Sequence, residues 1–178
     1  MMPNLELSFD GGYLRPLKIL DIHKDYIDGL NDPTVNFYLD SVKFNHQTFE
    51  SVSNYVSLNS ASIDSVLWGV WLKEYENHVG TVCIHGIELR HKTAYIGICL
   101  FNKDTWGFGV GSKSIKSVTT WAINYLGLRW VEAGIFSSNV ASQKAFVSAG
   151  YTWIYDIPKK YIHDGQPVDV KIYVAKDR

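Results

Sequence analysis

Apolar residues follow two different repeats along this chain, one typical of strands and the other typical of helices. Between Thr93 and Phe101 the apolar residues alternate with others, which predicts a strand with one apolar face: Ala94, Ile96, Ile98 and Leu100. From Lys113 to Leu126 they are three or four residues apart, which predicts a helix with a continuous apolar stripe. Gly127 follows at the position where a left-handed residue commonly ends a helix.

The remaining elements are predicted from the same spacings and from residues that start or stop them. Asp21 is expected to cap a helix that runs through Leu30 and stops at Asn31-Asp32-Pro33. The segment 35–44 is aromatic and irregular, and we interpret it either as packing or as a wall of a substrate cleft. Further helices are expected over 47–58 and 139–149, and further strands over 13–20, 66–73, 78–88, 130–136, 151–157 and 168–175. Gly80 and Gly86 are candidate bulges in the strand over 78–88. Asp164-Gly165 is expected to form the turn of a hairpin between the last two strands.

The order of these elements indicates an α/β protein with one domain that spans residues 1–178. The strand over 66–73 is apolar on both faces, so we expect it to be central and covered on both sides. A chain of 178 residues is long enough to bury a proper core, and no repeat, low-complexity tract or linker divides it.

Composition narrows the classes of function. A net charge of -1 argues against a nucleic-acid binder that relies on bulk electrostatics, and no apolar stretch is long enough for a membrane span. The six histidines lack metal-binding spacing, so no metal is expected. Cys83 and Cys99 each lie singly in a strand-like run, a pattern that fits reduced thiols and not a disulfide framework. No signal peptide is visible over residues 1–10. We therefore expect a cytoplasmic protein; its aromatic content of 14% suits a deep ligand cleft.

The segment from Trp106 to Ser112 has the composition of an anion-binding loop. It places glycine at every second position, at 107, 109 and 111, between the strand that ends near Phe101 and the helix that begins near Lys113. Glycine lets the backbone turn tightly and bring its amides close to a ligand. At the start of a helix those amides reinforce the positive end of the helix dipole. The loop therefore predicts a cofactor that carries phosphate.

Two common phosphate-binding motifs do not fit this loop. Counted from Gly107, a P-loop requires glycine at the position of Ser112. A dinucleotide-binding motif counted from Gly107 requires glycine at the same place, and counted from Gly109 it requires glycine at Ser114. The remaining candidate is the loop that binds the pyrophosphate of acyl-coenzyme A.

With that loop, the chain resembles the GNAT superfamily of N-acetyltransferases, and most of all its RimJ/RimL-like branch. Trp106-Gly107-Phe108-Gly109-Val110-Gly111 is similar to the W-G-x-G-x-G/A loop of the branch. The segment Leu30-Asn31-Asp32-Pro33 resembles its L-N-D-P motif. Asn139 and Ser142, followed by Ala149-Gly150-Tyr151, resemble its N-x-x-S…G-[FY] motif, and the order of elements matches from about Leu14 to Ala175.

The resemblance implies a fold and a set of cofactor contacts. The fold is a mixed, mostly antiparallel sheet of about seven strands with helices on both faces. The strands over 93–101 and 130–136 splay into a V, and the pantetheine arm of acetyl-CoA enters the gap. The implied cofactor-binding residues are Leu100, Phe101, Asn102, Trp106, Gly107, Phe108, Gly109, Val110, Gly111, Ser112, Asn139 and Ser142.

The expected reaction is direct attack of a primary amine on the acetyl thioester in a ternary complex. Many GNAT enzymes carry a tyrosine acid seven residues after the motif asparagine, but this chain has Phe146, which leaves Ser142 as the candidate proton donor. Tyr95 stands where the branch often has a glutamate and is the first candidate for the base; Glu88, His85 and His91 are the others. Lys113 opposes the helix dipole unless an anion is bound, although a solvated lysine is the commoner case.

The amine acceptor stays open between several classes. The resemblance implies either the α-amine of a protein N-terminus or a small-molecule amine, and the stretch from Lys160 to Asp169 also resembles enzymes that acetylate nucleotide-linked amino sugars. A protein acceptor predicts an open acidic groove, and a nucleotide sugar predicts a closed aromatic pocket with basic residues. A non-catalytic CoA-binding module is a further alternative, and a homodimer is common in the family.

Overall fold

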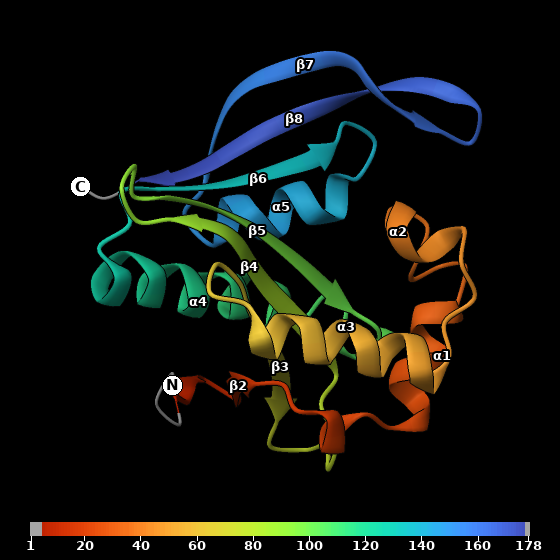
Figure 1. Cartoon of the computed structure of the whole chain (residues 1–178). Coiled ribbons are helices and arrows are strands. Elements are labelled where there is room, and N and C mark those ends of the chain that lie inside the picture. The colour runs from red at the N-terminus through yellow and green to blue at the C-terminus, as the bar shows by residue number, and fades with distance from the viewer. Residues whose placement is uncertain (1–4, 177–178) are drawn as a thin grey trace.

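The computed structural model describes residues 5–176, which form one eight-stranded sheet in the order β1-β2-β3-β4-β5-β6-β8-β7 (Figure 1). Every neighbouring pair is antiparallel except β5 and β6. The sheet is therefore mixed and mostly antiparallel, as expected. The strands are β1 (Leu7–Phe9), β2 (Gly12–Pro16), β3 (Val66–Leu72), β4 (Gly80–Glu88), β5 (Thr93–Leu100), β6 (Trp130–Phe136), β7 (Thr152–His163) and β8 (Gln166–Lys176).

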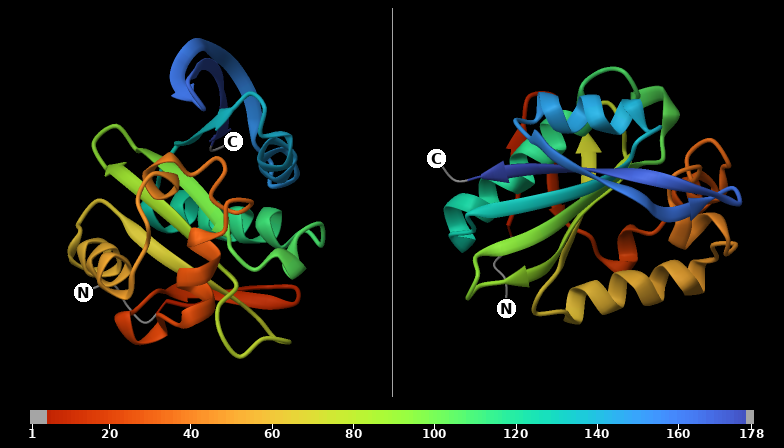
Figure 2. Two further views of the ribbon diagram at one scale, coloured as in Figure 1. Left: turned by 90° about the vertical axis from the view of Figure 1, so that its right-hand side faces the viewer. Right: turned by 90° about the horizontal axis from the view of Figure 1, so that it is seen from above.

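Helices cover both faces of the sheet, and the right-hand view of Figure 2 shows α3 and α5 on opposite sides of the strands. The α-helices are α1 (Lys24–Asn31), α2 (Asp40–Lys43), α3 (Phe49–Ala61), α4 (Val110–Leu126) and α5 (Val140–Ser148), and two 3-10 turns lie at Ile19–Asp21 and Lys103–Thr105. Gly127 ends α4 with a left-handed φ of 66°, which confirms the predicted cap. None of the helices in the described residues is long and apolar enough to cross a membrane.

The alternation of side chains along β3 divides the core into two parts. Val66, Trp68 and Val70 face α4 and belong to the larger cluster, whereas Leu67 and Trp71 face α1 and α3. All of these side chains are buried, so β3 is covered on both faces, as its apolar sequence predicts. β3 pairs with β2 on one side and with β4 on the other, so it lies inside the sheet and is covered on both faces.

The two strands at the predicted splay do separate. β5 pairs with β6 only at the three positions from Thr93↔Trp130 to Tyr95↔Glu132. Beyond that point β5 stays paired with β4 as far as Leu100, while β6 stays paired with β8 as far as Phe136. Each arm thus keeps one partner and leaves its inner edge without a strand. The V-shaped splay between 93–101 and 130–136 is confirmed.

Several local predictions are wrong. Asp21 does not cap a helix; α1 begins at Lys24 after His23, and Asp21 instead pairs with Arg15 at 2.6 Å. Gly80 is not a bulge, because it pairs in regular register with Val70 and Leu100. A Cβ there would lie 2.5 Å from the Leu100 side chain, so glycine permits close strand packing. Gly86, with φ of 59°, does lie at an irregularity of β4.

The remaining differences concern where elements begin. β1 adds an eighth strand to the roughly seven expected, because a strand of three residues is too short for a periodic signal. α4 begins at Val110, inside the glycine loop and not at Lys113. β7 and β8 both extend to the Asp164-Gly165 turn, so the final hairpin is longer than predicted and its tip reaches the region of α2 (Figure 1).

Candidate active site

The gap between β5 and β6 has a floor made by the start of α4 and by α5. A Cβ atom added at Gly111 would lie 3.6 Å from the Leu100 side chain, 3.7 Å from that of Ile98 and 3.9 Å from that of Ala145. Gly111 therefore lies where β5, α4 and α5 meet, and its missing side chain leaves space between them. Both strand arms reach this region with unpaired inner edges.

The glycine loop presents backbone amides at the start of α4. Gly107 and Gly109 have left-handed φ angles of 82° and 76°, which favour glycine. Gly109 is the N-cap of the helix and offers no side chain to its amides. The first amides of a helix lack partners within the helix, and Lys113 N–H is the first to bond back, to Gly109 O at 3.0 Å. The amides of Val110, Gly111 and Ser112 thus lie at the helix start without intrahelical partners, the arrangement in which helices bind anions, and we call them the amide cradle.

Trp106 links this loop to the end of β5. Its indole Nε1–H donates to the Leu100 carbonyl oxygen at 2.9 Å, although the ring is 40% exposed. Two predicted cofactor residues, Leu100 and Trp106, are thereby in contact with each other. The side chain of Phe108 projects into solvent and is 75% exposed.

Phe101 and Asn102 lie at the same strand end, but their side chains are engaged elsewhere. The Phe101 ring is buried against Tyr26 and His78, with ring centroids 4.8 Å and 5.1 Å away. Asn102 Oδ1 accepts from the Asp104 N–H at 3.0 Å. Both residues line a separate cavity of ≈ 460 Å³ beneath the 3-10 turn that follows β5. If Phe101 and Asn102 contact a ligand in the gap, they do so through backbone atoms.

Asn139 and Ser142 lie at the start of α5, on the other arm of the gap. Asn139 is the N-cap, and its Oδ1 accepts from the Ser142 N–H at 3.2 Å. Ser142 lies one turn before Ala145, so it shares the helix face that approaches Gly111. The capping role expected of Asn139 is confirmed, and it fixes the backbone from which the Ser142 hydroxyl projects.

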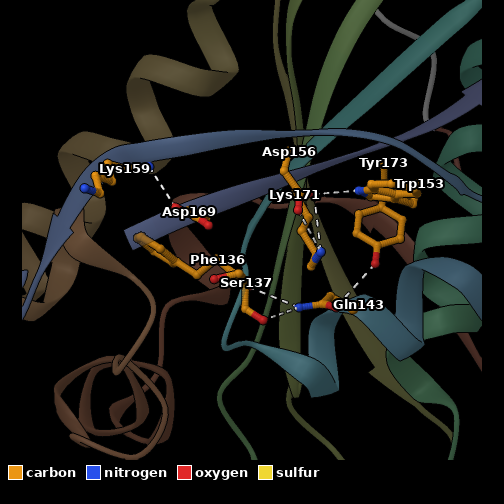
Figure 3. A network of polar contacts seen from close by, with 9 residues as sticks. All are labelled: Phe136, Ser137, Gln143, Trp153, Asp156, Lys159, Asp169, Lys171 and Tyr173. Carbon is orange, nitrogen blue, oxygen red and sulfur yellow. Dashed lines mark hydrogen bonds and ion pairs between the residues drawn. The ribbon is translucent and has the colours of Figure 1, made fainter. Parts of the chain in front are cut away.

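A polar network that sequence reasoning missed holds α5 against the end of β6 (Figure 3). Gln143 Nε2 donates to the carbonyl oxygens of Phe136 at 3.3 Å and Ser137 at 2.9 Å. Its Oε1 accepts from the Tyr173 hydroxyl of β8 at 3.3 Å. An ordinary glutamine in a short helix gives no sequence signal for this role. On the outer hairpin, Asp156 joins Trp153 and Lys171.

The candidate bases lie at different depths of the gap. Tyr95 is half-exposed at the last β5–β6 pair, where the splay begins, and stacks on His85 of β4 with centroids 5.9 Å apart. Partial burial lowers the pKa of His85, which favours a neutral imidazole able to accept a proton. Glu88 bonds the Arg90 N–H at 2.9 Å, and His91 lies in the same β4–β5 turn, before the splay. The geometry brings Tyr95 and His85 together and leaves the other two apart.

Two departures from the family pattern have clear structural positions. Phe146 is a core residue, 2% exposed, whose ring meets Tyr151 edge-on at 4.9 Å. Lys113 turns away from the loop, and its Nζ contacts the Asp10 carboxylate at 3.2 Å and carbonyl at 3.1 Å. The lysine is thus paired with the β1–β2 turn, and its charge is partly balanced without an anion in the cradle.

The L-N-D-P segment anchors the chain that follows α1. Asn31 Nδ2 donates to the carbonyls of Ile27 at 3.0 Å and Gln47 at 2.8 Å, and its Oδ1 accepts from the Gln47 N–H at 2.8 Å. Asp32 pairs with Lys103, which holds the pKa of this carboxyl at about 2. The segment 32–44 is therefore tied to α3 and to the 3-10 turn after β5.

The segment 35–44 then packs against the tip of the β7–β8 hairpin. We call this contact the hairpin cluster; it comprises Phe37, Tyr38, Asp40, Lys43, Phe136, His163 and Asp164. Its rings include a Tyr38–His163 stack at 5.4 Å and a Phe136–His163 contact at 5.2 Å. The Tyr38 hydroxyl donates to the Ser138 carbonyl at 3.1 Å, immediately before Asn139. The aromatic segment thus packs against the end of β6 and the hairpin tip, which confirms the packing alternative; a role as a cleft wall stays a prediction.

Comparison with known proteins agrees with this geometry. Residues 13–152 match the family model of the acetyltransferase (GNAT) domain. The chain is 24% identical over 180 residues to the uncharacterized N-acetyltransferase YoaA of Bacillus subtilis (strain 168), covering 100% of this chain and 99% of that protein.

Solved structures share the fold. A spermidine N-acetyltransferase from Vibrio cholerae, in complex with CoA and spermine, matches with a TM-score of 0.81 at 16% identity, over 94% of this chain and 96% of that one. A GNAT-family acetyltransferase from Bacillus anthracis matches with a TM-score of 0.81 at 18% identity, over 97% and 98% of the two chains. Because the family model spans most of its length, the chain belongs to the GNAT family and is an N-acetyltransferase.

Proposed function

We propose that this protein transfers the acetyl group of acetyl-CoA to a primary amine by direct attack in a ternary complex. The observation that supports this most is the conjunction of the splay with the amide cradle. The unpaired edge of β5 beyond Tyr95 leads directly to the amides of Val110, Gly111 and Ser112. A thioester with a long amide-containing arm and a pyrophosphate requires both features side by side.

The residues present fit coenzyme A, the cofactor of the family. The cradle has no side chain at Gly109 to compete for the amides, and Gly111 leaves open the space that a Cβ would fill between α4, β5 and α5. The loop amides would hold the pyrophosphate, the inner edge of β5 would pair with the arm, and Asn139 and Ser142 would lie beside it. Trp106 would fix the angle between strand and loop.

Acetyl-CoA supplies an activated acyl group together with a thiolate leaving group. The Ser142 hydroxyl is the proton donor that we assign to the leaving sulfur, because Phe146 cannot donate. Tyr95 is our candidate for passing the proton of the amine, at the start of the splay, to the neutral imidazole of His85 on which it stacks. Backbone amides along β5 polarise the carbonyl that the amine attacks.

The RimJ/RimL-like branch and the acceptor classes stay proposals. A structure provisionally described as a ribosomal-protein-serine acetyltransferase from Vibrio cholerae shares the fold with a TM-score of 0.72 at 17% identity, and it favours a protein acceptor. The neighbour bound to spermine favours a small aliphatic amine. The aromatic hairpin cluster is the feature expected for a nucleotide-linked amino sugar. Two free thiols, Cys83 and Cys99, support a reducing, cytoplasmic setting.

An assay of CoA release tests the proposal. The purified protein would be incubated with acetyl-CoA and, separately, with N-terminal peptides, short aliphatic amines and amino sugars, and free thiol would be measured. We expect release that depends on one acceptor class and falls in Ser142→Ala. Absence of release with every class, while acetyl-CoA still raises the melting temperature, would instead support a non-catalytic CoA-binding module.

A further inference from the structure

The hairpin cluster carries an unusual arrangement around one buried histidine. His163 is 8% exposed, and neither of its ring nitrogens makes a hydrogen bond. Its Nδ1 lies 3.6 Å from the Asp40 carboxylate, and its Nε2 lies 3.7 Å from the Asp164 carboxylate. A buried polar side chain without hydrogen bonds is uncommon and requires an explanation. Here both unbonded nitrogens point at carboxylates, at distances slightly too long for hydrogen bonds.

A primary ammonium group already occupies one side of this cluster. Lys43 Nζ pairs with the Asp164 carboxylate and lies 4.7 Å from the centre of the Phe37 ring. Carboxylates and aromatic faces are the two groups that attract an ammonium ion most strongly in proteins. Lys43 pairs with Asp164, whereas Asp40 makes no ion pair with a lysine or arginine among the described residues. The chemistry of the cluster therefore suits a second cation.

The position of the cluster relates it to the gap. Phe136 ends β6 and lies four residues beyond Glu132, or about 13 Å past the last β5–β6 pair at ~3.3 Å per residue. The Tyr38–Ser138 bond joins the cluster to the residue before Asn139. The cluster is thus joined to the start of α5, the helix that carries Ser142.

We propose that the acceptor is an aliphatic diamine or polyamine whose second, non-reacting ammonium group binds to Asp40 and Asp164 over the aromatic rings of the hairpin cluster. This inference rests on the proposed N-acetyltransferase function and narrows its acceptor. The acceptor ammonium replaces Lys43 at Asp164 or joins it at Asp40. A nucleotide-linked sugar would bring negative charge to these carboxylates, and a peptide N-terminus would bring a neutral backbone.

Three acceptors that share the reacting primary amine and differ in the group at the other end of the carbon chain test the inference. CoA release would be measured with butane-1,4-diamine, butylamine and 4-aminobutanoate. We expect kcat/KM for the diamine to exceed that for butylamine about tenfold or more, since a charge-assisted hydrogen bond contributes on that scale, and 4-aminobutanoate to be the poorest acceptor. A diamine-to-butylamine ratio near one would overturn the inference, while release with either amine would leave the proposed function standing.

Variants that remove a negative charge or a positive charge from the hairpin cluster show whether the cluster causes the preference for the diamine. Asp164→Asn and Asp40→Asn should each bring the diamine-to-butylamine ratio toward one, whereas Lys43→Gln should raise it, because a competing ammonium is removed. Asp156→Asn is a matched control on the same hairpin, where Asp156 pairs with Lys171 at 3.0 Å outside the cluster. If the cluster only held the hairpin in place, all three variants would affect both amines alike and the ratio would not move.

A binding measurement decides the same question without turnover. Thermal unfolding would be followed for the protein saturated with CoA, with increasing butane-1,4-diamine or butylamine. We expect the diamine to raise the melting temperature at concentrations where butylamine does not, and Asp164→Asn to abolish that difference. Equal shifts with both amines, or an unchanged difference in Asp164→Asn, would overturn the inference even if no acetylation were detected.

Discussion

The indole nitrogen of Trp106 donates to the carbonyl oxygen of Leu100 at 2.9 Å, and this bond joins the glycine loop to the last residue of β5. Because the amide cradle begins four residues after Trp106, the bond sets the position of the cradle relative to the inner edge of β5.

Replacement of Trp106 by phenylalanine should weaken cofactor binding more than turnover. Trp106→Phe keeps an aromatic ring but removes the donor, and one hydrogen bond contributes about 0.5–1.5 kcal/mol, or about a threefold to tenfold rise in KM for acetyl-CoA. Steady-state kinetics would show this rise with a smaller change in kcat. Trp153→Phe is the matched control, since its Nε1 bonds Asp156 at 2.7 Å on the outer hairpin. Equal effects of both variants would contradict the role of Trp106.

A side chain at Gly111 should close the cofactor space. Gly111→Val would place atoms between Leu100, Ile98 and Ala145, where even a Cβ would already be in van der Waals contact. We expect acetyl-CoA to lose its stabilising effect in a thermal-shift measurement, in which each melting temperature with acetyl-CoA is compared with the unliganded value of the same variant. Gly127→Ala is the control: its φ of 66° makes alanine cost about 1 kcal/mol of stability, while the shift caused by acetyl-CoA should persist.

Much of this architecture is predictable from local patterns. The bounds of β6 match the expected 130–136, and Gly127 and Asn139 act as the predicted caps, because each of these signals depends on neighbouring residues alone. Asp21 shows the limit of that reasoning. It resembles an N-cap in sequence, but a salt bridge to Arg15, from a different element, takes its carboxylate.

The site is less predictable where it depends on contacts between distant segments. The glycine loop, Asn139 and Ser142 are visible in the sequence as motifs. The Gln143 network and the hairpin cluster are not visible, because the residues in them come from segments far apart in the sequence. Lys43 and Asp164, which form an ion pair in the hairpin cluster, are one example. The sequence indicates the packing of segment 35–44 against the hairpin tip only through the aromatic residues of that segment and the Asp164-Gly165 turn.

Loss of the Ser142 hydroxyl should slow the chemical step. Ser142→Ala keeps the helix cap, because Asn139 bonds the backbone N–H and not the side chain. We expect kcat to fall about tenfold to a hundredfold with KM for acetyl-CoA nearly unchanged, as general acid catalysis contributes on this scale. Ser148→Ala, at the far end of the same helix, controls for changes in helix stability. An unchanged kcat in Ser142→Ala would remove this residue from the mechanism.

Acid should destabilise the protein through His78. This ring is 2% exposed, its Nδ1 lies 3.1 Å from His23 Nε2, and burial lowers its pKa to about 3. The unfolded state takes up a proton near pH 6.5 and the folded state does not, so stability present above that pH is lost as the pH falls. The loss is about 1.4 kcal/mol per pH unit between roughly 6 and 4.

Urea unfolding at several pH values measures this dependence. His78→Gln should be less stable at neutral pH but should show a slope shallower than the unmodified protein by about one proton. Identical slopes in His78→Gln and the unmodified protein would show that His78 is not the group that titrates.

We propose that acetyl-CoA binds along the inner edge of β5 with its pyrophosphate on the amides at the start of α4. A titration of the ¹⁵N-labelled protein with acetyl-CoA, followed by amide NMR spectra, tests this directly. We expect saturable shifts concentrated at Val110, Gly111 and Ser112 and along Ile96–Leu100, with few changes in α3, which packs in the other part of the core from α4. Shifts confined to other parts of the chain, or none at millimolar cofactor, would contradict it.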